Sequence, residues 1–216
     1  MEINKIHLMD ALEFLKSLDE KSVDLVLTDP PYAIKWKQQI ELHGRKVMYH
    51  KFDELAGDGG WDKVDIKQLY LDLFKEFDRV VKDNGSVLIF VRNEWITYCL
   101  EAGKQFHFDV KASLYWEKNN PIPQVRKKNY LSSVETVVWL ARWNEDFCDF
   151  TFNFKKQKEM KNFIRLPLCQ GLERTEHPTQ KPLTLIKFLL EVHSNKGDLI
   201  IDPFVGSGTT AVPVRI

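Results

Sequence analysis

The stretch VDLVLTDPPYAI, residues 23–34, decides the fold of this chain. Its first six residues are mostly apolar, a pattern typical of a buried strand. The tetrapeptide DPPY then ends the strand, because proline has a fixed φ and no backbone N–H. The carbonyl oxygens of Asp29 and Pro30 are left free to accept hydrogen bonds. Taken alone, the tetrapeptide is equally compatible with a plain strand stop and with a site that presents acceptors.

Strands and helices are expected to alternate along most of the chain. Strand-like runs cover residues 3–8, 23–28, 86–91, 108–117, 134–141 and 198–201, and apolar residues at helical spacing cover 11–18, 66–81, 94–102 and 183–190. This alternation predicts an α/β fold with a doubly wound, mostly parallel sheet. Within it, the runs 108–117 and 134–141 form a candidate hairpin.

The composition is that of a globular protein with a single domain, residues 1–216. No apolar run approaches the roughly 20 residues that cross a bilayer, and the N-terminus lacks the order of a signal peptide. We therefore expect a cytoplasmic protein with no membrane partner. The 31 acidic and 31 basic residues cancel, so binding to nucleic acid has to depend on local basic patches.

No metal site is expected. The cysteines Cys99, Cys148 and Cys169 are widely spaced and form no CxxC pair, which argues against both a disulfide framework and a zinc site. His43 and His50 have no acid or cysteine at a spacing typical of metal ligands.

Two long stretches lack regular periodicity. Residues 33–62 contain four glycines and mixed charges, and loops of this length are usually lids, binding loops or disordered segments, so this is a candidate mobile loop. Residues 142–174 lose periodicity while positive charge rises between Lys155 and Arg165.

The glycine-rich stretch DLIIDPFVGSGTT, residues 198–210, indicates a strand, a turn and the start of a helix. Glycines let a ligand approach the backbone, and a helix N-terminus offers N–H groups to an anionic group. A P-loop is excluded because no lysine follows Gly208. The spacing of Gly206, Gly208 and Ala211 matches the loose dinucleotide fingerprint, and a plain pair of helix-cap glycines is the alternative.

Three motifs together carry a family resemblance: DPPY at 29–32, HPTQKPLTLIKFLL at 177–190 and DPFVGSGTT at 202–210. In this order they resemble the beta group of S-adenosylmethionine-dependent DNA amino-methyltransferases. The resemblance takes in nearly the whole chain. It implies a Rossmann-like methyltransferase fold with a circularly permuted motif order, in which the catalytic tetrapeptide precedes the cofactor loop.

The resemblance implies that the tetrapeptide is catalytic, with roles for Asp29, Pro30, Pro31 and Tyr32. An exocyclic amine is a poor nucleophile because its lone pair is delocalised into the ring. The Asp29 carboxylate and the Pro30 carbonyl would accept the two amino hydrogens and localise that lone pair. Tyr32 would stack on a base rotated out of the duplex. In this family aspartate at the first position favours adenine N6, and cytosine N4 remains the alternative.

The resemblance also implies a set of contacts to S-adenosylmethionine. The methionine part would lie among Phe204, Gly206, Ser207, Gly208 and Thr209, with Asp202 near its ammonium group and Thr179 and Lys181 near its carboxylate. Asp10 would contact the adenine of the cofactor, and a plain helix N-cap is the equal alternative. His177 is as readily a cap or packing residue as a functional one.

Double-stranded DNA is the implied partner. The candidate phosphate contacts are Arg126, Lys127, Lys128 and Arg174, and residues 142–174 are the candidate target-recognition segment. A solvated charged loop is the alternative for each of them. The resemblance further suggests a cognate restriction endonuclease as a genetic partner, and either a monomer or a homodimer.

The sequence departs from the family at its C-terminal end. The chain stops six residues after Thr210, whereas the family continues through a helix and a strand whose final acid holds the cofactor ribose. We therefore expect a domain that is C-terminally truncated relative to the family, with an apolar sheet edge exposed. A catalytically silent DNA-binding remnant is the competing hypothesis, and a dinucleotide oxidoreductase is a distant one.

Overall fold

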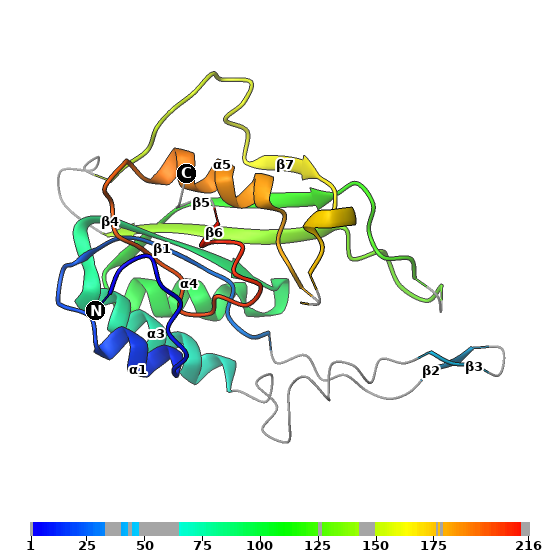
Figure 1. The fold of residues 1–216 in the computed structure, drawn as a ribbon, viewed down its shortest axis with the longest axis horizontal. Helices are drawn as coiled ribbons and strands as arrows, with labels where there is room; N and C mark the ends of the chain where they lie inside the picture. Colours follow the sequence, from blue (N-terminus) through cyan, green and yellow to red (C-terminus); the bar gives the residue numbers. More distant parts are fainter. Residues whose placement is uncertain are drawn as a thin grey trace.

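The structure is a computed structural model that describes residues 2–32, 40–42, 45–47, 65–124, 127–142, 150–175, 177 and 179–212. Its centre is a six-stranded sheet in the order β7-β5-β6-β4-β1-β8 (Figure 1). The strands are β1 Val23–Thr28, β4 Val81–Val91, β5 Phe108–Lys118, β6 Val134–Arg142, β7 Phe163–Leu166 and β8 Ile200–Ile201. A separate antiparallel pair joins β2 Ile40–Leu42 to β3 Arg45–Val47.

The sheet has a parallel half and an antiparallel half. Strand β1 runs parallel to both β4 and β8, whereas β6 runs antiparallel to both β4 and β5. The candidate hairpin of β5 and β6 is thereby confirmed. Strand β7 adds a further parallel pairing along the outer edge of β5. Three of the five pairings are parallel, so the sheet is mixed.

Helices cover both faces of the sheet, which confirms the doubly wound α/β fold (Figure 1). One face is covered by α1 Ala11–Lys16, α3 Ile66–Val80 and α4 Ile96–Gln105, and the other by α5 Leu183–His193. Short 3-10 helices lie at η1 Asn93–Trp95 and η2 Gly171–Glu173. Strands β1 and β4 are buried on both faces, which is why they are nearly continuous apolar runs rather than alternating ones.

Local chemistry explains where the long helix α3 begins and which face it buries. The Asp65 carboxylate accepts hydrogen bonds from the backbone N–H groups of Lys67 and Gln68 and so caps the first turn. Apolar side chains at spacings of three and four then share one face, and Phe74 and Phe77 on that face are fully buried. Burial of an aromatic side chain of this size contributes about 2 kcal/mol or more.

The structure corrects three expectations of local structure. Residues 3–8 form no strand, because Ile3 and the pair Ile6 and Leu8 differ in parity and cannot all face one side of a sheet; all three remain exposed. The glycine-rich turn leads into no helix among the described residues up to 212. The strand expected at residues 86–91 begins earlier, at Val81, and so includes Asn84 and Gly85.

Gly85 instead lies at an irregularity within β4. The register between β1 and β4 shifts there, and a Cβ on Gly85 would lie 2.5 Å from Val81 Cγ1 and 3.0 Å from the Asp24 carbonyl oxygen. Only glycine fits so close to a neighbouring backbone. The shift sets the register with which the end of β1 meets the rest of the sheet.

Candidate active site

The ends of β1 and β8 meet at one cavity of about 900 Å³, because parallel neighbours place their carboxyl ends at the same edge of a sheet. The three motifs of the sequence all reach this cavity. Its lining includes twelve of the thirteen residues expected in the tetrapeptide and the cofactor site: Asp10, Asp29, Pro30, Pro31, Tyr32, Thr179, Lys181, Asp202, Phe204, Gly206, Ser207 and Thr209. Gly208 belongs to the same loop but does not line the cavity.

The DPPY tetrapeptide is fixed by hydrogen bonds at each end. The Tyr32 hydroxyl donates to Asp29 Oδ1, and the indole N–H of Trp95 donates to the Tyr32 carbonyl over 3.1 Å. Trp95 belongs to η1, just after β4, and sequence reasoning missed it. Burial raises the pKa of Asp29 above its ordinary value, against the opposing influence of the Lys181 ammonium. Burial, with the Asp29 carboxylate, also holds the pKa of Tyr32 well above its ordinary value.

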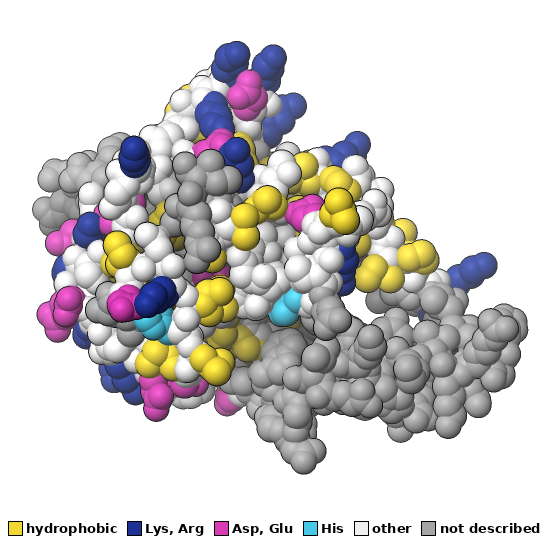
Figure 2. All heavy atoms as spheres, in the orientation of Figure 1, with side chains coloured by type: hydrophobic (Ala, Val, Ile, Leu, Met, Phe, Trp, Pro, Cys, Tyr) yellow, Lys and Arg dark blue, Asp and Glu magenta, His cyan; other side chains and the backbone are white. Residues whose placement is uncertain are grey.

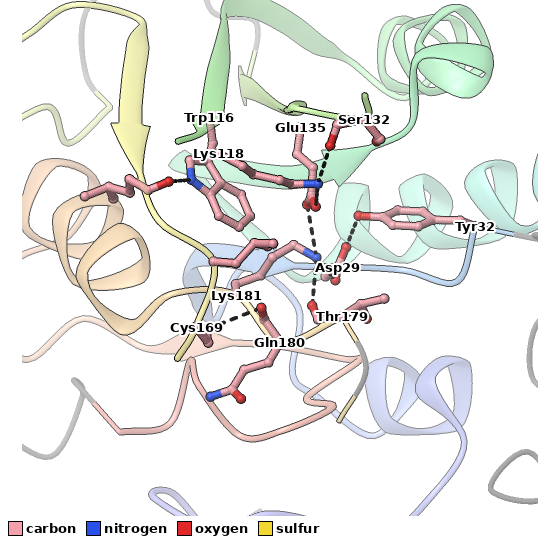
Figure 3. A network of polar contacts seen from close by, with 12 residues as sticks. Asp29, Tyr32, Trp116, Lys118, Ser132, Glu135, Cys169, Thr179, Gln180 and Lys181 are labelled. Carbon is pink, nitrogen blue, oxygen red and sulfur yellow. Dashed lines mark hydrogen bonds and ion pairs between the residues drawn. The ribbon is translucent and has the colours of Figure 1, made fainter. Parts of the chain in front are cut away.

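Lys181 lies at the centre of a chain of alternating charges (Figure 3). Its ammonium donates to Asp29 Oδ2, and it also lies 3.4 Å from Glu135 Oε2. Glu135 Oε1 in turn lies 2.7 Å from the ammonium of Lys118. Burial disfavours charged Lys181, but the two carboxylates outweigh burial and hold its pKa above the ordinary value. We predicted Lys181 near the methionine carboxylate, and the structure places its ammonium on Asp29.

Sequence reasoning missed both Glu135 and Lys118. The signal was weak: each is a charged residue at the end of an apolar strand, Lys118 closing β5 and Glu135 near the start of β6. Their meeting follows from the antiparallel register, in which Trp116 pairs with Glu135. That register cannot be read from either segment alone.

Asp202 ties the glycine-rich loop to the strand that carries the tetrapeptide. Its Oδ1 accepts from the Thr28 hydroxyl over 2.8 Å and from the Phe204 backbone N–H over 3.1 Å, and its Oδ2 accepts from the Thr210 hydroxyl over 2.7 Å. Burial raises the pKa of Asp202 to about 6, although the hydroxyls of Thr210 and Thr28 oppose the shift. A cationic group bound beside Asp202 would favour the ionised carboxylate.

The glycine-rich loop has the backbone conformation that glycine favours. Gly206 has φ of 50° and Gly208 has φ of 77°. A Cβ on Gly206 would lie 3.1 Å from His177 Nε2, so the imidazole of the HPTQKP segment packs directly on the loop. Burial and the Lys181 charge lower the pKa of His177, which favours the neutral ring. Its Nδ1 is buried and has no hydrogen-bond partner among the described residues.

Two further expected residues have clear structural partners. Asp10 is the N-cap of α1, because its Oδ1 accepts from the backbone N–H groups of Leu12 and Glu13 at 2.9 and 3.2 Å. It also lines the cavity, so the cap and a cofactor contact are compatible. The Thr179 carbonyl accepts from Lys181 Nζ over 3.3 Å.

The HPTQKP turn is held by residues that precede it. The Gln180 amide accepts from the Thr175 backbone N–H over 2.8 Å and donates to the Glu173 carbonyl over 2.8 Å. The Glu173 carboxylate accepts from the Leu183 N–H over 2.6 Å and so caps the start of α5. These contacts fix the position from which Lys181 points into the site.

Three of the candidate DNA contacts, Lys127, Lys128 and Arg174, are not among the residues that line the cavity. Lys127, Lys128 and Arg174 are exposed, and Arg126 lies outside the described residues. The recognition segment 142–174 includes β7, so part of it belongs to the central sheet, and residues 143–149 are not described. Figure 2 shows Lys and Arg side chains gathered over the segment that precedes β7. Most of the candidate loop 33–62 also lies outside the described residues.

Some of the positive charge in the recognition segment is already paired within the protein. Lys155 lies 2.5 Å from Glu191 on α5, and Arg165 on β7 forms an ion pair with Glu117 on β5. These pairs fix the segment to the sheet and to α5. The described part of the chain contains no group of three or more His, Cys, Asp or Glu side chains placed to hold a metal ion. It also contains no helix long and apolar enough to cross a bilayer.

Comparisons with known proteins point in one direction. The model of a family described as DNA methylase, with N6 and N4 methyltransferases as members, matches residues 23–215. The type II methyltransferase M.HinfI of Haemophilus influenzae is 30% identical over 232 residues, which cover 99% of this chain and 62% of that protein. The type II methyltransferase M2.DpnII of Streptococcus pneumoniae is 31% identical over 221 residues, covering 95% of this chain and 78% of that protein.

Solved structures agree with the fold. The M1.HpyAVI–SAM complex superposes with a TM-score of 0.72 at 28% identity, over 98% of this chain and 87% of that one. The cytosine-N4-specific PvuII DNA methyltransferase superposes with a TM-score of 0.71 at 19% identity, which shows a shared fold. The chain spans about three fifths of the length of M.HinfI.

Proposed function

Because this chain belongs to the DNA methylase family of N6 and N4 amino-methyltransferases, we propose that it moves a methyl group from S-adenosylmethionine to the N6 amino group of adenine in DNA. The observation that carries the proposal is the convergence of three motifs on one cavity. The acceptor tetrapeptide, the glycine-rich loop and the HPTQKP turn come from distant parts of the sequence and line the same space.

The residues of the cavity fit S-adenosylmethionine. The volume of about 900 Å³ is at the upper end of small-molecule sites. Gly206 leaves backbone exposed where a side chain would fill the space, Asp202 suits an ammonium group, and Asp10 lies at the helix start expected to contact the adenine. S-adenosylmethionine would supply an electrophilic methyl group, whose bond to sulfur breaks with the electron pair remaining on sulfur as the new bond to nitrogen forms.

Asp29 and Pro30 would prepare the nucleophile. When their oxygens accept the two amino hydrogens, the nitrogen lone pair is localised and the positive charge that develops on nitrogen is stabilised in a preorganised site. The amino proton released after transfer would pass to Asp29 Oδ1, whose burial-raised pKa suits it to accept a proton. The Tyr32 hydroxyl occupies that oxygen in the structure, so the incoming amino group would displace it.

The preference for adenine N6 rests on aspartate at the first position of the tetrapeptide. Cytosine N4 is the other base amine that this chemistry serves. Mass spectrometry of nucleosides from DNA treated with the protein and labelled S-adenosylmethionine distinguishes them: we expect N6-methyladenine, and N4-methylcytosine would overturn the choice of base.

The decisive variant is Asp29→Ala. We expect it to reduce methyl transfer by at least about a hundredfold, because the acceptor that activates the nitrogen is lost. Titration calorimetry should show cofactor affinity close to that of the unmodified chain. Robust transfer by the variant would sink the assignment. A chain that binds DNA but no S-adenosylmethionine would instead support the silent remnant.

We further propose double-stranded DNA as the partner, with Arg126, Lys127, Lys128 and Arg174 as phosphate contacts and residues 142–174 reading the target. The type II names of the relatives support a role in restriction and modification. A restriction endonuclease gene beside this one, whose enzyme is blocked by the methylation, would test that role.

A further inference from the structure

A row of four alternating charges runs from the ends of β5 and β6 to the tetrapeptide (Figure 3). Lys118 ends β5, Glu135 lies near the start of β6, Lys181 belongs to the HPTQKP turn and Asp29 follows β1. Neighbouring groups are in contact: 2.7 Å between Lys118 and Glu135, 3.4 Å between Glu135 and Lys181, and a direct hydrogen bond from Lys181 to Asp29.

Burying these charges costs free energy, which suggests that they have a role in the site. The two lysine side chains are only 9% and 6% exposed, and buried ion pairs often contribute little net stability because each charge must leave water. Glu135 does not line the cavity, so it is not placed to touch a substrate there. Its effect on the reaction has to act through Lys181.

The spacing of the charges suggests what that effect is. Alone, the Lys181 ammonium would neutralise Asp29 and weaken it as an acceptor for an amino group. Glu135 lies beside the same ammonium, and its negative charge offsets part of the effect of the Lys181 charge on Asp29. Glu135 Oε2 accepts no hydrogen bond of good geometry within the described structure, so at 3.4 Å it acts on Lys181 mainly through its charge. Lys118 in turn balances Glu135.

We propose that Glu135 is a positioning residue for methyl transfer, which holds the Lys181 ammonium against Asp29 while leaving that carboxylate basic enough to activate the amino nitrogen. This inference rests on the proposed function, and it concerns a residue outside the cavity. Removing the charge of Glu135 should lower the pKa of Asp29, since a nearby negative charge disappears. A less basic acceptor forms weaker hydrogen bonds to the amino group.

The other groups around Asp29 are unchanged by this substitution. The titratable and charged groups that face or influence it from the packed elements are Lys181, Glu135, Tyr32, His177, Tyr70 and Asp202. Of these groups, only Glu135 is replaced in the Glu135→Gln variant.

The first test is kinetic and uses the full chain. Glu135→Gln should lower kcat by roughly tenfold, because a less basic acceptor activates the amino nitrogen less, while the KM for DNA and for S-adenosylmethionine changes less than twofold. The matched control is Glu76→Gln on α3, a glutamate that pairs with Arg79 at 3.0 Å and does not line the cavity. We expect the control to keep the kcat of the unmodified chain. Equal kcat values for the two variants would refute the proposal.

The second test needs no turnover, so it separates this proposal from the proposed function. Carboxyl ¹³C NMR of chains labelled at aspartate follows the Asp29 signal, assigned by its loss in Asp29→Asn. We expect Glu135→Gln to shift the Asp29 titration to lower pH and Lys118→Met to shift it to higher pH. If the titration shifts in these opposite directions but the chain transfers no methyl group, the proposed function is refuted and the electrostatic effect of Glu135 on Asp29 is supported. Shifts in one direction, or none, would overturn the charge row.

Discussion

The pKa of Asp202 makes stability depend on pH in a way that one substitution should remove. Burial raises this pKa from 3.8 to about 6 in the folded chain. The folded chain therefore holds the proton more tightly than the unfolded chain does. The stability that this proton contributes is present at low pH and is lost as the pH rises through about 6.

The size of the effect follows from the two pKa values. Between pH 5 and pH 8 the unmodified chain should lose about 1.4 kcal/mol of its free energy of unfolding through Asp202 alone. Asp202→Asn has nearly the same shape, and its amide can donate to the Thr210 hydroxyl where the carboxylate accepted. The variant keeps its contacts and loses the titration. It should therefore gain about 1.4 kcal/mol relative to the unmodified chain over this pH range.

Urea unfolding of both chains at pH 5, 6, 7 and 8 measures this difference. Thr210→Val is the companion variant: it removes a hydrogen bond that stabilises the ionised carboxylate, so the loss of stability with rising pH should become larger. A constant difference between Asp202→Asn and the unmodified chain from pH 5 to pH 8 would refute the reasoning. Asp202→Asn should also bind S-adenosylmethionine more weakly, since residue 202, the proposed partner of the cofactor's ammonium group, has lost its charge.

Three further results are expected. Gly206→Ala should weaken S-adenosylmethionine binding roughly tenfold in calorimetry, because alanine is strained at a φ of 50° and its Cβ meets His177. The control is Gly197→Ala, where φ is 97° and no atom lies near the added Cβ. It should lower stability by about 1 kcal/mol and keep the affinity. Trp95→Phe should lower kcat about fivefold at unchanged cofactor affinity, because the Tyr32 carbonyl loses its hydrogen-bond donor. An unchanged kcat would show that this hydrogen bond does not hold the tetrapeptide in its active position. The double variant Lys127→Ala, Lys128→Ala should reduce the salt slope of DNA binding by about 2 in fluorescence anisotropy, whereas Lys196→Ala, exposed near α5, should leave the slope as it is.

The sequence predicts the elements whose pattern is strong. The run at β1 is apolar on both faces and the prolines that follow it must end a strand, so both the strand and the cavity-lining position of the tetrapeptide could be predicted. Helix α3 has a cap and a clear apolar face, and the structure begins it at the predicted residue. The doubly wound architecture follows from this alternation, and the structure and its relatives confirm it.

The remaining features depend on contacts between segments that are far apart. Lys118, Glu135 and Lys181 meet only because β5 and β6 share one register and the HPTQKP turn returns to their ends. Strand β7 could not be predicted, because its four residues show no clear sequence pattern and the strand is defined by its pairing with β5. The residues after Gly208 were expected to begin a helix, but the bonds there are isolated turns, such as Ala211 N–H to the Gly208 carbonyl.

The hydrogen bond between Thr28 and Asp202 joins residues 174 positions apart, and its consequence concerns synthesis. Strand β1 leaves the ribosome early, whereas β8, which covers its outer edge, leaves it much later. During that interval one edge of a mostly apolar strand is open to pairing with other chains. Docking of β8 closes this edge and completes the cavity in the same step, so a growing chain is most prone to aggregate just before its site can form.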